Sequence, residues 1–125
     1  MLKEILYIGA GGFIGSVMRY LVSQTLNPAT TAFPWGTLTV NILGCLIIGI
    51  IAGLTLRHPS LLSPGASLFL TVGLCGGFTT FSTFSKEALA LLQNNCTLAF
   101  ALYVIGSITI GVAAVAIGYT IVKIC

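Results

Sequence analysis

The chain has 125 residues, of which 57% are hydrophobic and only 6% are charged, and its mean hydropathy is +1.10. A water-soluble domain carries about 25% charged residues, so this composition excludes an ordinary solvent-facing surface. It is typical of a membrane protein.

Four apolar runs are long enough to cross a bilayer, which takes about 20 residues of α-helix. They cover approximately residues 5–23, 36–56, 68–92 and 98–122. We therefore expect an all-α fold in which residues 1–125 form a single four-helix transmembrane domain. Glu4 is out of place in the basic start of a signal peptide, and no convincing cleavage site follows the first run. We expect that run to be a span.

The positive charges are almost balanced between the two sides of such a four-span chain. One side holds Lys3, Arg57 and Lys123, and the other holds Arg19 and Lys86. Orientation normally follows the more positive, cytoplasmic side. A count of three against two leaves two interpretations open. Either the protein is weakly oriented with its termini inside, or it inserts both ways and pairs as an antiparallel dimer.

The first two spans each carry a polar residue with two possible roles. Gly11 and Gly15 have a spacing that lets helices approach closely. Arg19, near the end of the first span, either extends to the headgroups or forms a cationic vestibule for anions. Asn41, inside the second span, makes an interhelical hydrogen bond or serves as a pore-facing donor.

The third span is long and rich in glycine and hydroxyl groups. A continuous helix over residues 67–93 would measure roughly 40 Å, against a hydrocarbon core of about 30 Å. Gly73, Gly76 and Gly77 permit irregular backbone, so we expect a break there. Freed carbonyls and hydroxyls are tolerated at membrane depth only where protein or a watery cavity surrounds them. The pattern therefore predicts the lining of a pathway.

Aromatic and polar side chains follow this stretch at helical spacing. Phe81 and Phe84 are neighbours on one helical face, and the positive edges of their rings can solvate an anion weakly. Lipid-facing or core packing is the alternative for both. Glu87 follows closely on the same span, and Tyr103 and Ser107 form an i, i+4 pair on the fourth.

Three segments together resemble the Fluc (CrcB) fluoride channels: GGFIGSVMRY at 11–20, GTLTVNILG at 36–44 and GGFTTFSTF at 76–84. The likeness extends over the chain in length, number of helices and order of motifs. It implies an antiparallel, dual-topology homodimer with two fluoride pores in the cell's inner (plasma) membrane. It favours the dual-topology interpretation of the charge count.

The resemblance also implies roles for individual residues. The pore would include Asn41, Phe81, Ser82, Thr83, Phe84, Tyr103, Ser107, Glu87 and Arg19. The backbone carbonyls of Gly76 and Thr79 from both subunits would hold a structural sodium ion at the dimer centre. Gly111, one turn beyond Ser107, has no hydroxyl, which leaves the extent of the fourth-helix polar track open.

The function expected from this resemblance is passive export of cytoplasmic fluoride down its electrochemical gradient. A small four-helix proton-coupled multidrug exporter is the main alternative. That family's pattern has a carboxylate in the middle of the first span, whereas here the first span has only Glu4, at its start. A passive scaffold subunit would explain the glycines but not the polar constellation. No nucleophile–base pair or metal cluster is evident in the sequence, so we do not expect an enzyme.

Overall fold

The computed structural model describes residues 1–27 and 32–125, and all regular structure in that part of the chain is helical. Helix α1 (Leu2–Leu26) is followed by α2 (Trp35–Arg57). The third span consists of four consecutive elements: α3 (Pro64–Leu68), the π-helix η1 (Phe69–Cys75), α4 (Gly76–Phe78) and α5 (Phe81–Gln93). Helix α6 (Thr97–Ile124) comes last. In the described residues, four helical stretches are long and apolar enough to cross a membrane: α1, α2, α3 to α5 together, and α6. The expected all-helical fold with four apolar helices is confirmed.

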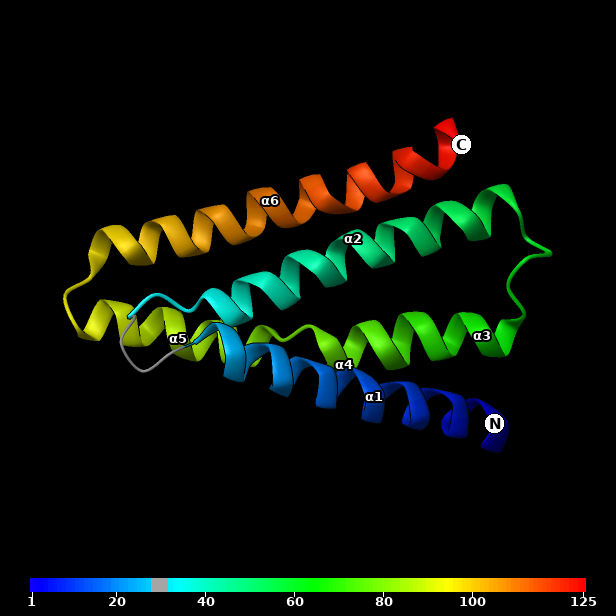
Figure 1. The fold of residues 1–125 in the computed structure, drawn as a ribbon, viewed down its shortest axis with the longest axis horizontal. Helices are drawn as coiled ribbons and strands as arrows, with labels where there is room; N and C mark the ends of the chain where they lie inside the picture. The colour runs from blue at the N-terminus through cyan, green and yellow to red at the C-terminus, as the bar shows by residue number, and fades with distance from the viewer. Residues whose placement is uncertain (28–31) are drawn as a thin grey trace.

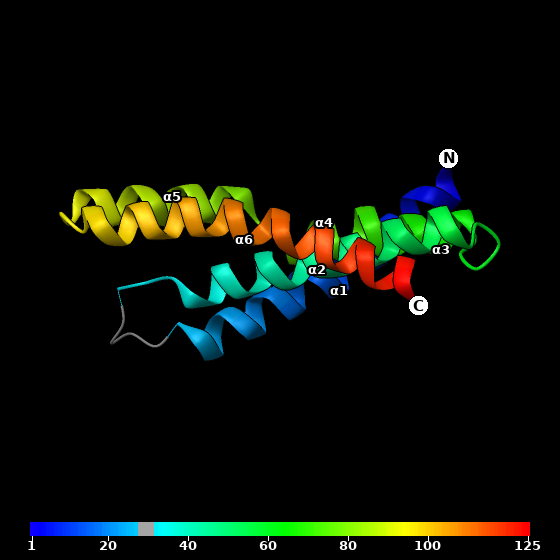
Figure 2. The ribbon, with the colours of Figure 1, turned by 90° about the horizontal axis from the view of Figure 1, so that it is seen from above.

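The helices lie side by side in two opposite directions (Figure 1). α2 and α6 run the same way and form the most extensive packing, while α1 and the α3–α5 segment run the other way. α1 packs mainly against η1 and α4, and α5 packs against α6. Figure 2 shows α5 and the first half of α6 on one side of the molecule and the later half of α1 on the other. Both chain termini lie at the same end.

Glycines allow the helix backbones to touch. A Cβ on Gly73 would lie 2.8 Å from the carbonyl oxygen of Ile8, and one on Gly77 would lie 2.6 Å from that of Gly12. Between α2 and α6, a Cβ on Gly118 would lie 2.9 Å from the amide nitrogen of Ile50. Small residues at such contacts replace the hydrophobic driving force that membranes lack.

The third span is irregular in two places: the π-helix η1, which includes Gly73, and an interruption just beyond the glycines. The backbone of Gly76 is helical, with φ −63° and ψ −37°. The interruption falls at Thr79 (φ −83°, ψ 160°) and Thr80 (φ −152°, ψ 121°), which are extended. The glycine-containing stretch is thus irregular in the π-helix, and the extended break follows it at Thr79. Gly73 and Gly77 provide close contact with α1, and two β-branched threonines adopt the extended conformation that suits them.

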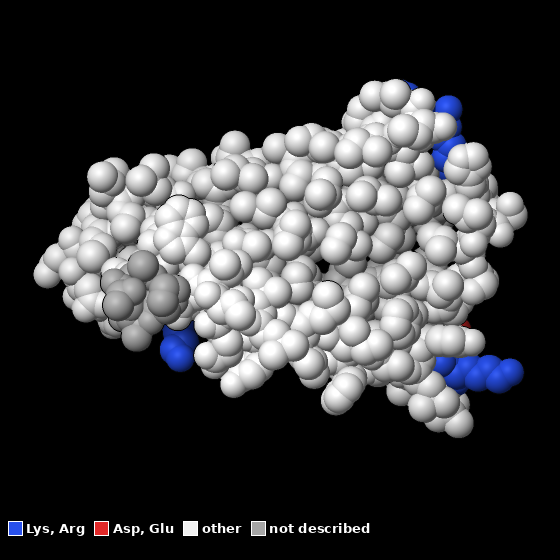
Figure 3. Space-filling model, in the orientation of Figure 1, with Lys and Arg blue, Asp and Glu red and all other residues white. Residues whose placement is uncertain are grey.

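The surface is apolar between charged ends (Figure 3). On the face shown, Lys and Arg atoms appear only toward the two ends of the molecule. Large side chains such as Phe13, Leu102 and Ile105 are 61–73% exposed along the helices. Exposed apolar area of this kind is suited to lipid or to a protein partner rather than to water.

Candidate functional site

The interruption at Thr79 and Thr80 has its own hydrogen-bonding scheme. The backbone amide of Thr80 donates to Oδ1 of Asn41 at 2.8 Å, and Nδ2 of Asn41 donates to the carbonyl of Thr80 at 3.1 Å. The hydroxyl of Thr80 accepts from the amide of Thr83 at 3.2 Å and so caps the start of α5. Of the two roles expected for Asn41, the interhelical hydrogen bond is therefore confirmed.

Arg19 lies on the other side of the interruption. Its Nε donates to the carbonyl oxygen of Gly77 at 3.0 Å. Gly77 is in the last turn before the chain becomes extended, where carbonyls lose their helical partners. The side chain of Arg19 thus points to the third span.

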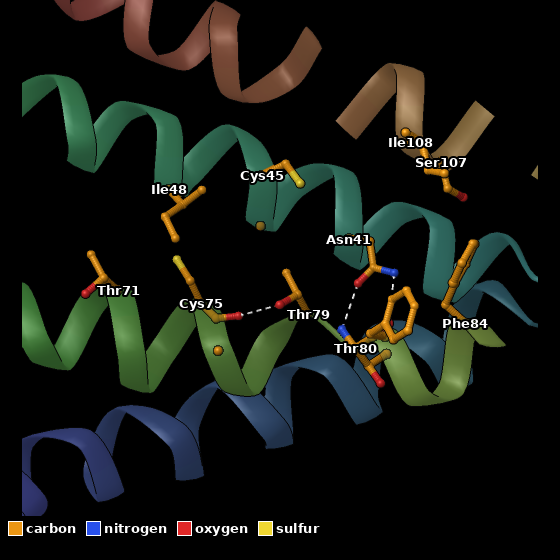
Figure 4. A pocket seen from close by; sticks show the side chains of 13 residues that line it. Asn41, Cys45, Ile48, Thr71, Cys75, Thr79, Thr80, Phe84, Ser107 and Ile108 are labelled. Carbon is orange, nitrogen blue, oxygen red and sulfur yellow. Dashed lines mark hydrogen bonds between the residues drawn. The ribbon is translucent and has the colours of Figure 1, made fainter. Parts of the chain in front are cut away.

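A groove of about 400 Å³ opens beside the interruption, between α2, the third span and α6 (Figure 4). Its polar side chains are those of Asn41, Thr71, the two extended threonines and Ser107. The lining residues are Asn41, Gly44, Cys45, Ile48, Thr71, Cys75, Gly76, Thr79, Thr80, Phe81, Phe84, Ser107 and Ile108. Asn41, Gly76, Thr79, Phe81, Phe84 and Ser107 of the sequence-derived site are thereby brought together.

The two phenylalanines differ in their surroundings. Phe81 is 80% exposed, whereas Phe84 is half-buried. Their ring centroids are 5.8 Å apart with the planes tilted by 38°. Phe84 also packs on Tyr103, with centroids 5.0 Å apart. Phe81 therefore projects outward from the chain, whereas Phe84 is held in its interior by Tyr103.

The carboxylate of Glu87, nearly one turn after Phe84 on α5, makes two hydrogen bonds to other helices. Oε1 of Glu87 accepts from the hydroxyl of Thr37 at 2.9 Å, and Oε2 accepts from the hydroxyl of Tyr103 at 3.0 Å. Thr37 and Tyr103 are almost fully buried, at 2% and 0% exposure. Glu87 thus ties α5 to α2 and to α6 through charge-assisted hydrogen bonds. Neither Glu87 nor Tyr103 lines the groove itself.

Ser107 has a buried hydroxyl oxygen with no hydrogen-bond partner among the described residues. It is one helical turn from Tyr103 on α6 and lines the groove. Buried hydroxyls in proteins normally have a partner, so this oxygen is available to a ligand or water. Ser82 and Thr83 are placed differently, because both precede Phe84 at the start of α5 and neither lines the groove.

Two residues that hold the site together were not assigned a role from the sequence. Thr37 binds Glu87, and its position one turn before Asn41 on α2 was the available signal. Thr80 supplies both the partner of Asn41 and the cap of α5. Its place in a run of hydroxyl residues did not distinguish it from its neighbours.

These features define a small multi-pass helical membrane protein with a polar groove at an interrupted span. The family model described as "CrcB-like protein, Camphor Resistance (CrcB)" matches residues 6–119, and the chain belongs to this family. It is 48% identical over 118 residues to a protein from Phocaeicola vulgatus named fluoride-specific ion channel FluC, covering 94% of this chain and 96% of that one. Proteins of the same name from Chlorobium chlorochromatii and Chlorobaculum tepidum are 50% and 46% identical over 115 and 124 residues. The alignments cover 92% and 99% of this chain, and 88% and 98% of theirs.

Proposed function

We propose that this protein is a fluoride-selective passive channel, not an enzyme, and that it exports cytoplasmic fluoride across the cell's inner membrane. The observation that carries the proposal is the identity of 46–50%, over nearly the whole chain, to relatives named fluoride-specific ion channels. The groove has the groups that such a function needs.

Fluoride is small and strongly hydrated, so a pore must replace its water with hydrogen-bond donors and positive dipoles. The binding must also be weak enough for the ion to leave. The amide of Asn41, the free hydroxyl of Ser107 and the ring edges of Phe81 and Phe84 provide partial positive charge along the groove. Among the residues that the structure describes, no Lys or Arg lines it, so no full positive charge there would trap the anion.

Five residues expected in the pore are not among those that line this groove: Arg19, Ser82, Thr83, Glu87 and Tyr103. Their assignment to the fluoride path remains part of the proposal. Tyr103, whose hydroxyl donates to Glu87, packs on Phe84, and the pair Glu87–Tyr103 would continue the path beyond the phenylalanine.

The functional unit in this proposal is an antiparallel homodimer with two pores. The exposed ring of Phe81 and the open side of the groove support it, since a second copy could cover both. The near balance of positive charge between the two ends supports insertion in both orientations.

A structural sodium ion at the dimer centre is the second part of the proposal. The amide of Thr80, which a continuous helix would pair with the carbonyl of Gly76, donates to Asn41 instead. The amide of Thr83, the helical partner of the Thr79 carbonyl, donates to the Thr80 hydroxyl. Gly76 and Thr79 therefore have carbonyls diverted from helical bonding beside the groove, and carbonyl oxygen suits a small hard cation. When bound, the ion would supply fixed positive charge and join the subunits.

Flux from proteoliposomes loaded with potassium fluoride tests the function. A fluoride electrode should record rapid efflux when valinomycin supplies the counter-current of potassium. A chloride electrode should record no comparable efflux from vesicles loaded with potassium chloride. Efflux should not need a pH gradient. A requirement for a proton gradient would instead indicate a coupled exporter, and the absence of fluoride efflux would rule out the channel.

A further inference from the structure

Four residues of the first two spans surround the interruption of the third. Gly15 and Arg19 are one turn apart on α1, and Asn41 and Gly44 are nearly one turn apart on α2. A Cβ on Gly15 would lie 2.9 Å from the amide nitrogen of Phe78, and a Cβ on Gly44 would overlap the methyl group of Thr79. On each helix, a glycine permits close approach and a polar side chain one turn away reaches the interrupted backbone.

The two polar side chains replace the partners that the interruption removes. In a continuous helix, the amide of Thr80 would pair with the carbonyl of Gly76, and the amide of Phe81 with that of Gly77. Instead, Oδ1 of Asn41 accepts from the Thr80 amide, and Nε of Arg19 donates to the Gly77 carbonyl. Asn41 also donates to the Thr80 carbonyl, so its amide group acts as a surrogate peptide with one donor and one acceptor.

Carbonyls at this point are therefore satisfied selectively. Those of Cys75, Gly77 and Thr80 receive hydrogen bonds from Thr79, Arg19 and Asn41, respectively. Those of Gly76 and Thr79 lose their helical donors to Asn41 and to the Thr80 hydroxyl. An unsatisfied backbone group costs several kcal/mol in hydrocarbon, so the side chains that satisfy the other three determine where the free carbonyls point.

We propose that Asn41 and Arg19 are positioning residues that fix the peptide planes of the interruption, and that they act on ion passage through the backbone of Thr80 and Gly77. The effect on passage rests on the proposed channel function. The effect on the backbone does not, and it can be measured without fluoride. For Asn41, one of its two amide N–H bonds is committed to Thr80, so contact with an ion and support of the backbone are compatible.

Amide hydrogen exchange of threonine tests the backbone effect directly. In protein labelled with ¹⁵N-threonine and held in detergent, the Thr80 amide should exchange slowly. Asn41→Ala should accelerate it by about tenfold or more, since a hydrogen bond worth roughly 1–2 kcal/mol is lost. Asn41→Asp keeps an acceptor for that amide and should retain most of the protection. The Thr120 amide, far away on α6, reports general loosening of the fold. Equal acceleration of Thr80 and Thr120, or none at Thr80, would overturn the proposal.

An amide-to-ester replacement at Thr80 tests whether Asn41 acts through the backbone. It removes the Thr80 N–H that donates to Asn41, makes the Thr79 carbonyl a weaker ester acceptor, and leaves the asparagine in place. Positioning predicts that fluoride flux falls about fivefold to tenfold, relative to the same replacement at the exposed helical residue Leu89. A flux equal to that of the Leu89 ester would mean that Asn41 acts only as a direct donor.

Two substitutions separate positioning from charge at Arg19. Arg19→Gln places an N–H donor where Nε was and removes the charge, whereas Arg19→Lys keeps the charge and removes that donor. Positioning predicts several-fold higher fluoride flux for Arg19→Gln than for Arg19→Lys. The opposite order would show that Arg19 acts by its charge alone, and would overturn its part of the proposal. If the unsubstituted protein passes no fluoride, the channel function fails while the exchange result still stands.

Discussion

The phenol of Tyr103 donates a hydrogen bond of 3.0 Å to Oε2 of Glu87, and this bond joins α6 to α5. The other carboxylate oxygen accepts from Thr37 on α2. One carboxylate thus connects three spans at a place where Tyr103 is completely buried. The rings of Phe33 and Phe84 pack against Tyr103 from two sides, so the hydrogen bonds lie next to one wall of the groove.

Removing the hydroxyl of Tyr103 should destabilise the protein more than removing an exposed tyrosine hydroxyl does. Tyr103→Phe leaves Oε2 of the half-buried Glu87 without its donor, and the loss should be about 1.5–3 kcal/mol, as for hydrogen bonds to carboxylates. Unfolding in detergent, followed by circular dichroism, measures it. Tyr119→Phe is the matched control on the same helix, because Tyr119 is 40% exposed and its hydroxyl makes no hydrogen bond within the described residues. Equal losses for both variants would show that the Glu87 contact contributes nothing.

Replacing either groove phenylalanine should reduce fluoride flux, by different routes. Phe81→Ile removes an exposed ring and should lower flux by about tenfold or more with little change in stability, since few protomer contacts are lost. Phe84→Ile should lower flux and also destabilise the protein, because its ring packs on Tyr103.

Proteoliposome flux and thermal unfolding of the same preparations distinguish the two routes. Phe13→Ile is the control, since Phe13 is 73% exposed on α1 and far from the groove lining. Flux that survives both Phe81→Ile and Phe84→Ile would remove the ring edges from the proposed path.

Two of the three glycines of α6, Gly106 and Gly118, should respond oppositely to an added methyl group. A Cβ on Gly118 would meet the backbone of α2, whereas a Cβ on Gly106 would meet nothing within 4 Å. Gly118→Ala should therefore destabilise the protein by about 1–3 kcal/mol through overpacking. Gly106→Ala should be neutral or stabilise the helix by about 0.5–1 kcal/mol, since glycine is a poor helix former. Midpoints of thermal unfolding in detergent compare the pair, and a Gly118→Ala midpoint at or above the Gly106→Ala midpoint would contradict the packing.

The sequence was sufficient to predict the four spanning helices, because a run of about 20 apolar residues matches the bilayer thickness and leaves few other structures for it. It was also sufficient to single out Asn41, Phe81, Phe84 and Ser107, which stand out as polar or aromatic positions at helical spacing. The extended interruption at Thr79 and Thr80 lies just beyond the glycines at which irregular backbone was expected. Glycine permits broken backbone but does not require it, and Gly73 and Gly77 are instead needed for contact with α1. That need depends on which helix is adjacent.

The partner of each polar side chain was equally inaccessible from spacing. Arg19 and Gly77 are 58 positions apart, and Thr37 and Glu87 are 50 apart. Helical periodicity relates only residues within a few turns. It therefore placed Arg19 near the end of a span without indicating that its guanidinium reaches the third span.

Orientation in the membrane should respond to very few added charges. With three positive residues toward one end and two toward the other, the present bias is small. Ser60→Lys with Leu61→Lys adds two charges to an exposed loop at the end that holds both termini. Gln93→Lys with Asn94→Lys adds two at the opposite end, also in exposed positions. Each double variant should insert predominantly one way. If the unit is an antiparallel dimer, each alone should lose most of its fluoride flux, because neither supplies the opposite orientation.

Co-expression of the two double variants should restore the flux, since each then provides the orientation that the other lacks. Orientation itself is measured by labelling a single introduced cysteine in a background without the native cysteines. The cysteine replaces Ser60, except in the variant that carries Ser60→Lys, where it replaces Asn94. An impermeant maleimide should label the otherwise unchanged chain at Ser60 from both faces of the membrane, and each double variant mainly from one. A double variant that inserts one way and still conducts fully by itself would show that antiparallel pairing is not required for conduction.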